Sequence, residues 1–432
     1  MIRTPADRRD FLKSTMAAAA AAAIFAPAVR AQGAAALATA RVVVVGGGFG
    51  GATCARALRK ADPRIAVTMV EQNSTYTASP MSNAVIAGLR DLTAQQFGYD
   101  ALAREGISLA LTAATKIDTQ ARSVTLGATG QTLGYDRLVL SPGIDFRWNA
   151  IAGYDEAASA LMPHAYRGAE QIVLLRRQLE AMPDGGLVVV SAPVNPARCP
   201  PAPYERAGLI AHYLKNNKPR SKVIVLDAKD TFTMQRLFQN AWSELYPGLI
   251  EWVSLASGGV LASVDPKTRT LSTDFDTYQA AVANVIPPQK AGRLAELAGV
   301  ADRTGWCPVD PVTFGSKLQP DIHVIGDAAI AGAMPRSASA AHSQAEICAA
   351  AIVAQLAGRT PAAPTLTSSC FSLLAPDYAI SQRGTYRPTD DQYVESAPGI
   401  VVSPLAAERS ERSAEAKEAA AWYAGITAGV FG

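Results

Sequence analysis

Short apolar runs that end in turns recur along this chain of 432 residues. Four valines at 42–45 lead directly into the glycine-rich stretch 46–51, which is followed by an alanine-rich segment and a second apolar run. The segments 135–143 (YDRLVLSPG) and 321–329 (DIHVIGDAA) repeat this pattern of an apolar run and a turn. Continuous apolar runs that alternate with helical segments predict parallel strands buried on both faces, and therefore an α/β fold.

A second strand–turn–helix–strand pattern occupies the middle of the chain, from GGLVVVSAP (185–193) to KVIVLDA (222–228). We therefore expect two Rossmann-like dinucleotide-binding domains, arranged as in glutathione reductase, and a smaller C-terminal α+β domain. The second domain interrupts the first. The predicted boundaries are 40–155 and 289–360 for the split first domain, 156–288 for the insertion and 361–432 for the C-terminal domain.

The glycines after the first strand have the spacing of a dinucleotide-binding turn. Gly46 permits the tight turn, Gly48 permits close approach of a diphosphate, and Gly51 permits helix and strand to pack closely. The N-terminus of the following helix offers free N–H groups to phosphate. Glu71 ends the second strand, twenty residues after Gly51, where it can accept hydrogen bonds from ribose hydroxyls and repel a 2′-phosphate.

Two later turns indicate that the dinucleotide is FAD. One is the Pro-Gly turn that contains Gly143, and the other is Gly326-Asp327. In two-domain flavoproteins a Gly-Asp at this place contacts the ribityl and phosphate part of the cofactor. The alternative for Asp327 is an ordinary helix N-cap.

The corresponding turn of the second domain has no glycine between Ser191 and Arg206 and instead contains several prolines. Proline has no N–H for phosphate, and side chains block close approach of the backbone. The insertion is therefore expected to keep the fold without a nicotinamide site.

Residues 1–31 have the features of a twin-arginine export signal: Arg8-Arg9, an alanine-rich apolar stretch, and small residues up to a cleavage site near Ala31. A membrane anchor is the alternative, although the stretch is short for one. The remainder carries 35 basic and 35 acidic residues, which argues against a nucleic-acid partner. We expect a soluble periplasmic protein without stable membrane insertion.

The chain has five cysteines and four scattered histidines, so a metal site is not expected. Cys199 stands among prolines beside Arg198, which favours its thiolate, and Glu205 falls in the first turn of the next helix. Cys370 lies in a predicted strand of the C-terminal domain. A disulfide between Cys199 and Cys370 would link two domains, and a purely structural staple is the alternative reading.

These residues carry a family resemblance. From Arg41 onward the chain resembles the flavoprotein subunit of flavocytochrome c sulfide dehydrogenase, in the wider sulfide:quinone oxidoreductase group. The resemblance rests on the following segments: VVVVGGGFGGAT, SNAVIAG, GYDRLVLSPGI, RCPPAPYERA, NVIPPQKAG, GWCPVD, IHVIGDA, MPRSASAAHSQ and LLAPDYAIS. It implies a redox-active Cys199–Cys370 disulfide beside the flavin, Glu205 as the active-site carboxylate, and Trp422 near the flavin. Anchoring of the C-terminal helix is the alternative for Trp422.

The chain departs from this family at Ser79, which stands where related proteins carry a cysteine that binds FAD covalently. FAD is therefore expected to be bound non-covalently. The resemblance implies that sulfide is oxidised to sulfur or polysulfide and that electrons pass to a separate c-type cytochrome. Trp422, Tyr423 and Phe431 could form its docking surface or belong to the core.

Two other functions remain open at this stage. One is a sulfide:quinone oxidoreductase, and the other is a non-turnover redox-maintenance partner of a periplasmic sulfur-oxidising complex. The other three cysteines are interpreted as buried thiols, namely Cys54, Cys307 and Cys348. Cys307 is also a minor candidate for disulfide exchange.

Overall fold

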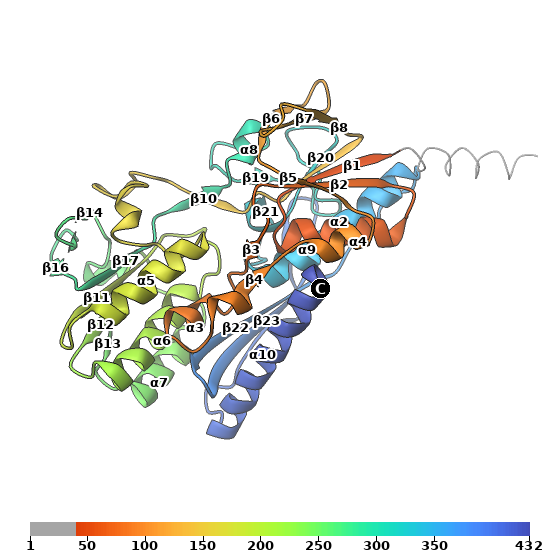
Figure 1. The fold of residues 1–432 in the computed structure, drawn as a ribbon. Coiled ribbons are helices and arrows are strands. Elements are labelled where there is room, and N and C mark those ends of the chain that lie inside the picture. The colour runs from red at the N-terminus through yellow and green to blue at the C-terminus, as the bar shows by residue number, and fades with distance from the viewer. Residues whose placement is uncertain (1–39) are drawn as a thin grey trace, which may run out of the picture.

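The computed structural model describes residues 40–432, so the expected export signal at 1–31 lies outside the described residues. Within the described part, no helix combines the length and apolarity needed to cross a membrane. Figure 1 shows two parallel sheets side by side, with the C-terminal strands and helix α10 (Arg409–Phe431) beneath them.

The first sheet is parallel throughout, with the order β20-β9-β1-β2-β5. Its strands are β1 (Arg41–Val45), β2 (Ala66–Glu71), β5 (Ser108–Leu111), β9 (Arg137–Leu140) and β20 (Ile322–Val324). The last strand comes from about 180 residues later in the chain than β9. Helices α2 (Phe49–Ala61) and α9 (Ala338–Leu356) pack against each other beside the sheet (Figure 1). Antiparallel strands β6 (Ala114–Asp118), β7 (Ser123–Leu126) and β8 (Thr132–Gly134) extend this half.

The second sheet is also parallel, with the order β13-β12-β11-β17. Its strands are β11 (Leu187–Ala192), β12 (Lys222–Asp227), β13 (Ile250–Val253) and β17 (Val282–Val285). The helices of this half are α5 (Ala169–Ala181), α6 (Ala202–Asn217) and α7 (Gln235–Leu245), and a small antiparallel sheet of β14 (Ser263–Asp265), β15 (Thr270–Ser272) and β16 (Thr277–Gln279) completes it. Strands β10 (Ile144–Phe146) and β18 (Gln289–Ala291) pair where the chain enters and leaves this half.

The C-terminal part is an antiparallel sheet of β22 (Leu366–Ala375), β23 (Tyr378–Pro388) and β24 (Tyr393–Val402), covered by α10. The chain end returns to the first half, where the Phe431 ring stacks on Tyr76 and Phe97 at centroid distances of 5.3 and 5.1 Å. Tyr423 is also buried; its hydroxyl group donates a hydrogen bond to the Ala94 carbonyl oxygen and accepts one from the Gln95 amide. Tyr423 and Phe431 therefore belong to the core and not to an exposed docking surface.

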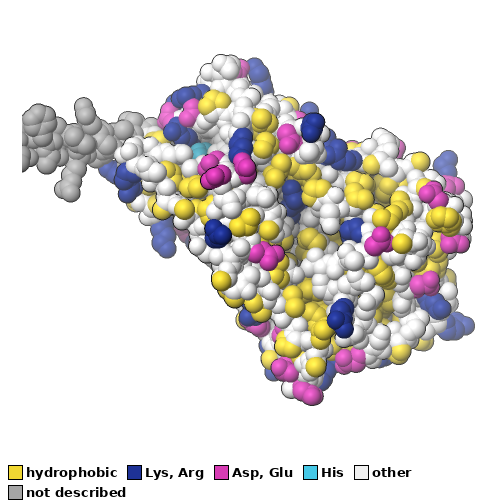
Figure 2. Space-filling view, turned by 180° about the vertical axis from the view of Figure 1, so that it is seen from behind, with side chains coloured by type: hydrophobic (Ala, Val, Ile, Leu, Met, Phe, Trp, Pro, Cys, Tyr) yellow, Lys and Arg dark blue, Asp and Glu magenta, His cyan; other side chains and the backbone are white. Residues whose placement is uncertain are grey.

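The predicted fold class is confirmed: two Rossmann-type units and a smaller C-terminal sheet domain are present. The short elements lie mostly around the junction of the parts and are α3 (Ser82–Ile86), α4 (Asp100–Arg104), α8 (Leu294–Leu297), β3 (Tyr76–Thr77), β4 (Gln96–Phe97), β19 (Cys307–Pro308) and β21 (Ala329–Ile330). Figure 2 shows the molecule hollowed between its two halves, with basic side chains at the edge of the hollow.

Candidate active site

A cavity of about 1100 Å³ lies where the three parts meet. A volume of this size is slightly above the usual range for ligand pockets, which is about 300–1,000 Å³. All but one of the predicted site residues line it, namely Gly46, Gly48, Glu71, Ser79, Gly143, Cys199, Glu205, Asp327, Cys370 and Trp422. The exception is Gly51, which lies behind the glycine turn. Residues separated by more than 300 positions in the sequence thus share one site.

The floor of the cavity is the glycine turn between β1 and α2. Gly46 has φ +105°, and a Cβ there would lie 2.3 Å from the Ser141 carbonyl oxygen. A Cβ on Gly51 would lie 1.7 Å from the Gly46 carbonyl oxygen, so only glycine lets the turn close on the helix. Gly48 caps α2 without a side-chain hydrogen bond, and the first turn of α2 has no acidic residue. The N–H groups and positive end of the helix dipole therefore face the cavity without an opposing charge in that turn.

Two carboxylates flank this floor. Glu71 accepts hydrogen bonds from the backbone N–H groups of Gly47 (2.8 Å) and Asn73 (3.0 Å), which fixes it beside the turn. The Oδ1 atom of Asp327 is buried and has no partner among the described residues, and burial raises the pKa of this carboxyl. Asp327 does not cap a helix through its side chain, so the capping alternative is not what the structure shows.

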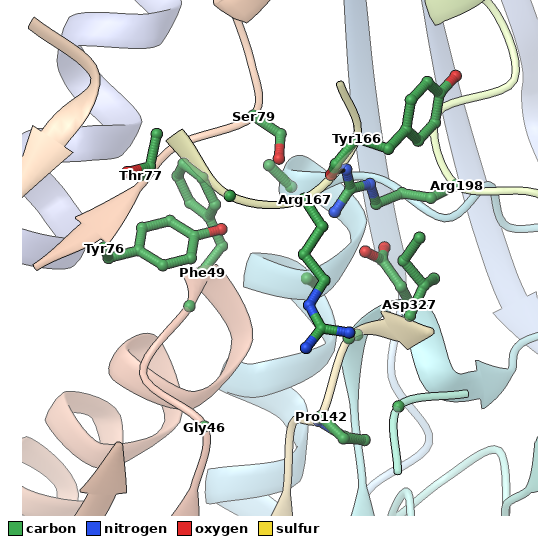
Figure 3. Close-up of a pocket in the computed structure, with 18 of the residues that line it drawn as sticks. Gly46, Phe49, Tyr76, Thr77, Ser79, Pro142, Tyr166, Arg167, Arg198 and Asp327 are labelled. Atoms are coloured by element: carbon green, nitrogen blue, oxygen red, sulfur yellow. Dashed lines mark hydrogen bonds between the residues drawn. The ribbon is translucent and has the colours of Figure 1, made fainter. Parts of the chain in front are cut away.

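The cradle fits a dinucleotide because it offers a glycine turn without side chains, open helix N–H groups, and an orphaned acceptor. Asp327 would hold hydroxyl groups of the cofactor, Glu71 would hold a ribose, and the glycine turn would hold the phosphates. Figure 3 shows Tyr76, Thr77 and Ser79 on one side of this space and Asp327 and Arg198 on the other. Ser79 has no sulfur with which to form a thioether.

The two predicted active-site cysteines are neighbours although 171 positions separate them. Cys199 lies in the turn after β11, and Cys370 lies in β22. Their side chains are within hydrogen-bonding reach of each other. Hydrogen bonding with Cys199 and with Ser337 lowers the pKa of Cys370, whereas hydrogen bonding with Cys370 and burial raise the pKa of Cys199 well above its usual value. These opposite pKa shifts favour the thiolate on Cys370, and not on Cys199 as expected from the neighbouring Arg198.

The backbone holds Cys199 in a left-handed conformation with φ +50°, which is uncommon for a residue other than glycine. Its N–H donates to the Arg336 carbonyl oxygen at 2.8 Å, and its own carbonyl oxygen accepts from Ala202 N–H at 2.9 Å. Arg336 in turn donates from Nε to the Asp327 carbonyl oxygen at 2.8 Å. Arg336, which the sequence reasoning did not single out, thus links the cysteine turn to the Gly-Asp turn. No signal beyond its place in the MPRSASAAHSQ segment could have revealed this role.

Glu205 stands in the first turn of α6, as predicted, and is 7% exposed. Its Oε1 accepts the backbone N–H of Leu373 at 3.2 Å, three residues after Cys370 in β22. Burial raises the pKa of Glu205 to about 7, and the hydrogen bond to Leu373 offsets only part of this effect. A carboxyl group beside the cysteine pair can therefore exchange a proton near neutral pH.

The turn of the second domain, where a nicotinamide cofactor would bind, is filled by side chains of the chain itself. Asp227, at the end of β12, is fully buried and accepts hydrogen bonds from Tyr204 Oη (2.6 Å), Trp252 Nε1 (2.9 Å) and Lys229 Nζ (2.6 Å). The Phe232 ring stacks on Tyr204 at a centroid distance of 3.6 Å. The acid that would bind a ribose is thus already occupied.

The remaining predictions have mixed outcomes. Trp422 lines the cavity and packs near Phe371, with a centroid distance of 5.7 Å. Cys54, Cys307 and Cys348 are completely buried, as expected, but Cys54 and Cys348 also contact each other across α2 and α9. Residues 40–432 contain no cluster of side chains suited to a metal ion.

Comparison with known proteins gives three family matches. Residues 172–287 match the model "Sulfide dehydrogenase [flavocytochrome c] flavoprotein chain, central", and residues 362–431 match "Flavocytochrome c sulphide dehydrogenase, flavin-binding". Residues 40–179 match the pyridine nucleotide-disulphide oxidoreductase model. The flavin-binding match agrees with the cradle described above, so FAD is confirmed as the cofactor.

Individual relatives agree with these matches. A sulfide dehydrogenase flavoprotein chain from Chlorobaculum thiosulfatiphilum is 62% identical over 47 residues, which is 98% of that short sequence and 11% of this chain. Mitochondrial sulfide:quinone oxidoreductase of Mus musculus is 22% identical over 66% of this chain and 65% of its own length, just under two thirds. The solved sulfide:quinone oxidoreductase of Aquifex aeolicus has the same fold, with a TM-score of 0.70 at 16% identity over 91% of this chain and 92% of that one.

The two sulfide dehydrogenase models cover most of the insertion and the C-terminal part, which include Cys199 and Cys370. This chain belongs to the flavoprotein family of flavocytochrome c sulfide dehydrogenase.

Proposed function

We propose that this chain is a periplasmic FAD-dependent sulfide dehydrogenase subunit that oxidises sulfide through a Cys199–Cys370 disulfide and passes electrons to a c-type cytochrome. The observation that carries the proposal is the meeting of Cys199, Cys370 and Glu205 in the FAD cavity. A structural staple would need neither a neighbouring carboxyl group with a pKa near neutrality nor access to a cofactor cavity.

The thiol chemistry follows from the unequal cysteines. Hydrosulfide attacks the Cys199 sulfur, the S–S bond breaks, and Cys370 leaves as a thiolate to which Ser337 would donate a hydrogen bond. The product is a persulfide on Cys199 with a thiolate on Cys370. The substrate sulfur is oxidised by two electrons, and the disulfide is reduced by the same two. Glu205 accepts the proton that hydrosulfide loses, and the pKa of about 7 suits this exchange.

Bound FAD supplies an acceptor for these two electrons and can release them one at a time to a one-electron partner. A further hydrosulfide displaces the outer sulfur of the persulfide as hydrodisulfide, the shortest polysulfide, and leaves both cysteines reduced. Loss of two electrons from this cysteine pair to the bound flavin would then restore the disulfide. The filled nucleotide site of the insertion supports this route, because it leaves no place for a nicotinamide to deliver or remove a hydride.

Rapid-mixing spectroscopy of the FAD-loaded protein with sulfide tests the proposal. We expect fast bleaching of the flavin absorbance in the parent and none in Cys199→Ser or Cys370→Ser. Cys307→Ser is the matched control, because it removes a completely buried thiol that does not line the cavity. Bleaching in the two active-site variants at the parental rate, or no bleaching in the parent, would contradict the proposal.

Quinone as the electron acceptor is the second candidate, because relatives named sulfide:quinone oxidoreductase share the sequence pattern and the fold. Turnover with sulfide and either cytochrome c or a short-chain quinone separates the two acceptors. Faster turnover with the quinone would favour this candidate. Bleaching without turnover by either acceptor would favour the redox-maintenance role.

A further inference from the structure

Arg167 is a charged side chain that lines the cavity and takes no part in the chemistry described above. It stands on the loop 163–168 that leads into α5, at the boundary of the insertion. Figure 3 shows its side chain extending from this loop into the cavity, on the side of Pro142 and the glycine turn. Its Nη1 forms an ion pair with Asp145 Oδ1 at 3.1 Å, and the side chain is 55% exposed.

The loop that carries Arg167 is rigidly held. The fully buried Arg206 donates to the carbonyl oxygens of His164 (2.9 Å) and Ala165 (2.7 Å), and Arg198 donates to that of Tyr166. The Gln171 side chain accepts from His164 N–H at 2.9 Å. The backbone just before Arg167 is therefore fixed, and only the long side chain is left to move.

Four arginines of the described residues line the cavity, and they differ in their bonding partners. Arg206 and Arg198 are bound to backbone carbonyl oxygens, and Arg293 precedes the short helix α8. Arg167 is itself 55% exposed and pairs with the partly buried Asp145 carboxylate, so solvent already weakens the ion pair that a phosphate would replace. The glycine turn itself, residues 46–51, contributes backbone dipoles but no cationic side chain.

We propose that Arg167 is an electrostatic latch for the diphosphate of FAD, held by Asp145 until the cofactor enters. The proposal rests on non-covalent binding of FAD in the function proposed above. It assigns to the insertion a part in holding the cofactor of the other domain. The guanidinium group matches a phosphate with two parallel hydrogen bonds. Such a latch compensates for the thioether that Ser79 cannot form.

Titration of the flavin-free protein with FAD, followed by flavin fluorescence, tests the latch without sulfide. A charge-assisted pair predicts that Arg167→Met raises the Kd about 10- to 100-fold at low ionic strength, and that salt narrows the difference. The Kd of Arg167→Lys for FAD should fall between those of the parent and of Arg167→Met. Arg220→Met is the matched control, because Arg220 forms a similar ion pair with Asp184 outside the cavity.

Asp145→Asn should change the Kd for FAD in the opposite direction to Arg167→Met. It removes the competing carboxylate, so FAD should bind up to about tenfold more tightly in this variant, and not in the Arg167→Met background. An unchanged Kd for FAD in Arg167→Met would overturn the latch. So would an Asp145→Asn variant whose Kd for FAD rises as much as that of Arg167→Met. A change confined to the sulfide concentration dependence would show that Arg167 serves entry of the sulfide anion instead.

Denaturation in acid separates this inference from the proposed function. If flavin stays with the precipitated chain, attachment is covalent and the latch is overturned, while the Cys199–Cys370 chemistry stands. If the cysteine variants bleach normally but Arg167→Met loses FAD, the latch stands and the disulfide route fails.

Discussion

The two parallel-sheet units of this molecule begin alike and differ at their first turns. In the first unit, glycines leave the N-terminus of α2 open, and its first turn has no acidic residue. In the second, Cys199 and prolines occupy the turn, and Glu205 stands in the first turn of α6. An acid at a helix N-terminus repels the phosphate that an uncharged turn attracts. The same supersecondary unit thus leaves its helix N-terminus open in one half of the molecule and places a cysteine and an acid there in the other.

The two units also differ in the surroundings of the acid that ends their second strand. Glu71 is held by backbone N–H groups at the edge of an open cavity, whereas Asp227 is enclosed by Tyr204, Trp252 and Lys229. The acid at the end of the second strand therefore lines the open cavity in one unit and accepts hydrogen bonds from buried side chains in the other.

Gly51→Ala should have the largest effect on this comparison. The added Cβ would meet the Gly46 carbonyl oxygen at 1.7 Å, so the backbone of the first turn must shift. We expect the protein to be purified without FAD, as judged by the ratio of flavin to protein absorbance. Gly425→Ala, on α10 with open space around its Cβ, is the control and should retain the parental flavin content. Full flavin content in Gly51→Ala would contradict the role of the first turn.

Glu205→Gln tests the acid at the second turn. The amide oxygen can still accept the Leu373 N–H, but the group no longer accepts a proton, so sulfide should bleach the flavin about 10²- to 10³-fold more slowly. The parental rate should contain a step with an apparent pKa of about 7 that the variant lacks. The titration of sulfide itself remains in both profiles, so identical profiles would rule Glu205 out as the proton acceptor.

The same carboxyl group makes a signed contribution to stability. Its pKa is raised in the folded protein to about 7 from an ordinary 4.5, so the folded state holds the proton more tightly. The contribution of Glu205 to stability is therefore fully present below about pH 4.5 and is lost as the pH rises through 7. Urea unfolding of flavin-free protein should show this loss in the parent and not in Glu205→Gln. Equal pH dependence in both proteins would contradict it.

Asp227→Asn tests the filled site of the second unit. The amide can replace only part of the hydrogen bonding and leaves the Lys229 charge unbalanced, so the free energy of unfolding should fall by about 3 kcal/mol. Urea unfolding measures the loss, and FAD affinity should stay at the parental value. Binding of NADH by the parent or by this variant, followed by nicotinamide fluorescence, would contradict the view that side chains have replaced the cofactor.

Asp327→Asn should have the smallest effect. The buried Oδ1 has no partner among the described residues, so removing the charge should stabilise the flavin-free protein slightly. Loss of a charged acceptor should weaken FAD binding about tenfold. Thermal unfolding and FAD titration together measure these opposite changes. A variant that binds FAD as tightly as the parent would remove Asp327 from the cradle.

The sequence by itself determined much of this picture, because local chemistry carries it. Buried valine runs, glycine spacing and proline content established both Rossmann-type units, and the Gly-Asp turn pointed to FAD before the tertiary arrangement was considered. Glu205 was placed in the first turn of its helix from the preceding prolines alone. These features depend on backbone conformations that a few neighbouring residues dictate.

Only the tertiary structure decided what depends on distant segments. No local pattern could show that Arg336 links the cysteine turn to Asp327, that Arg167 reaches the FAD cavity, or that Cys54 meets Cys348. Nor could it show which cysteine carries the lower pKa, since that depends on Ser337 and on the direction of one hydrogen bond. Burial and charge act through space, so they become fixed only when the two halves and the C-terminal sheet close around one cavity.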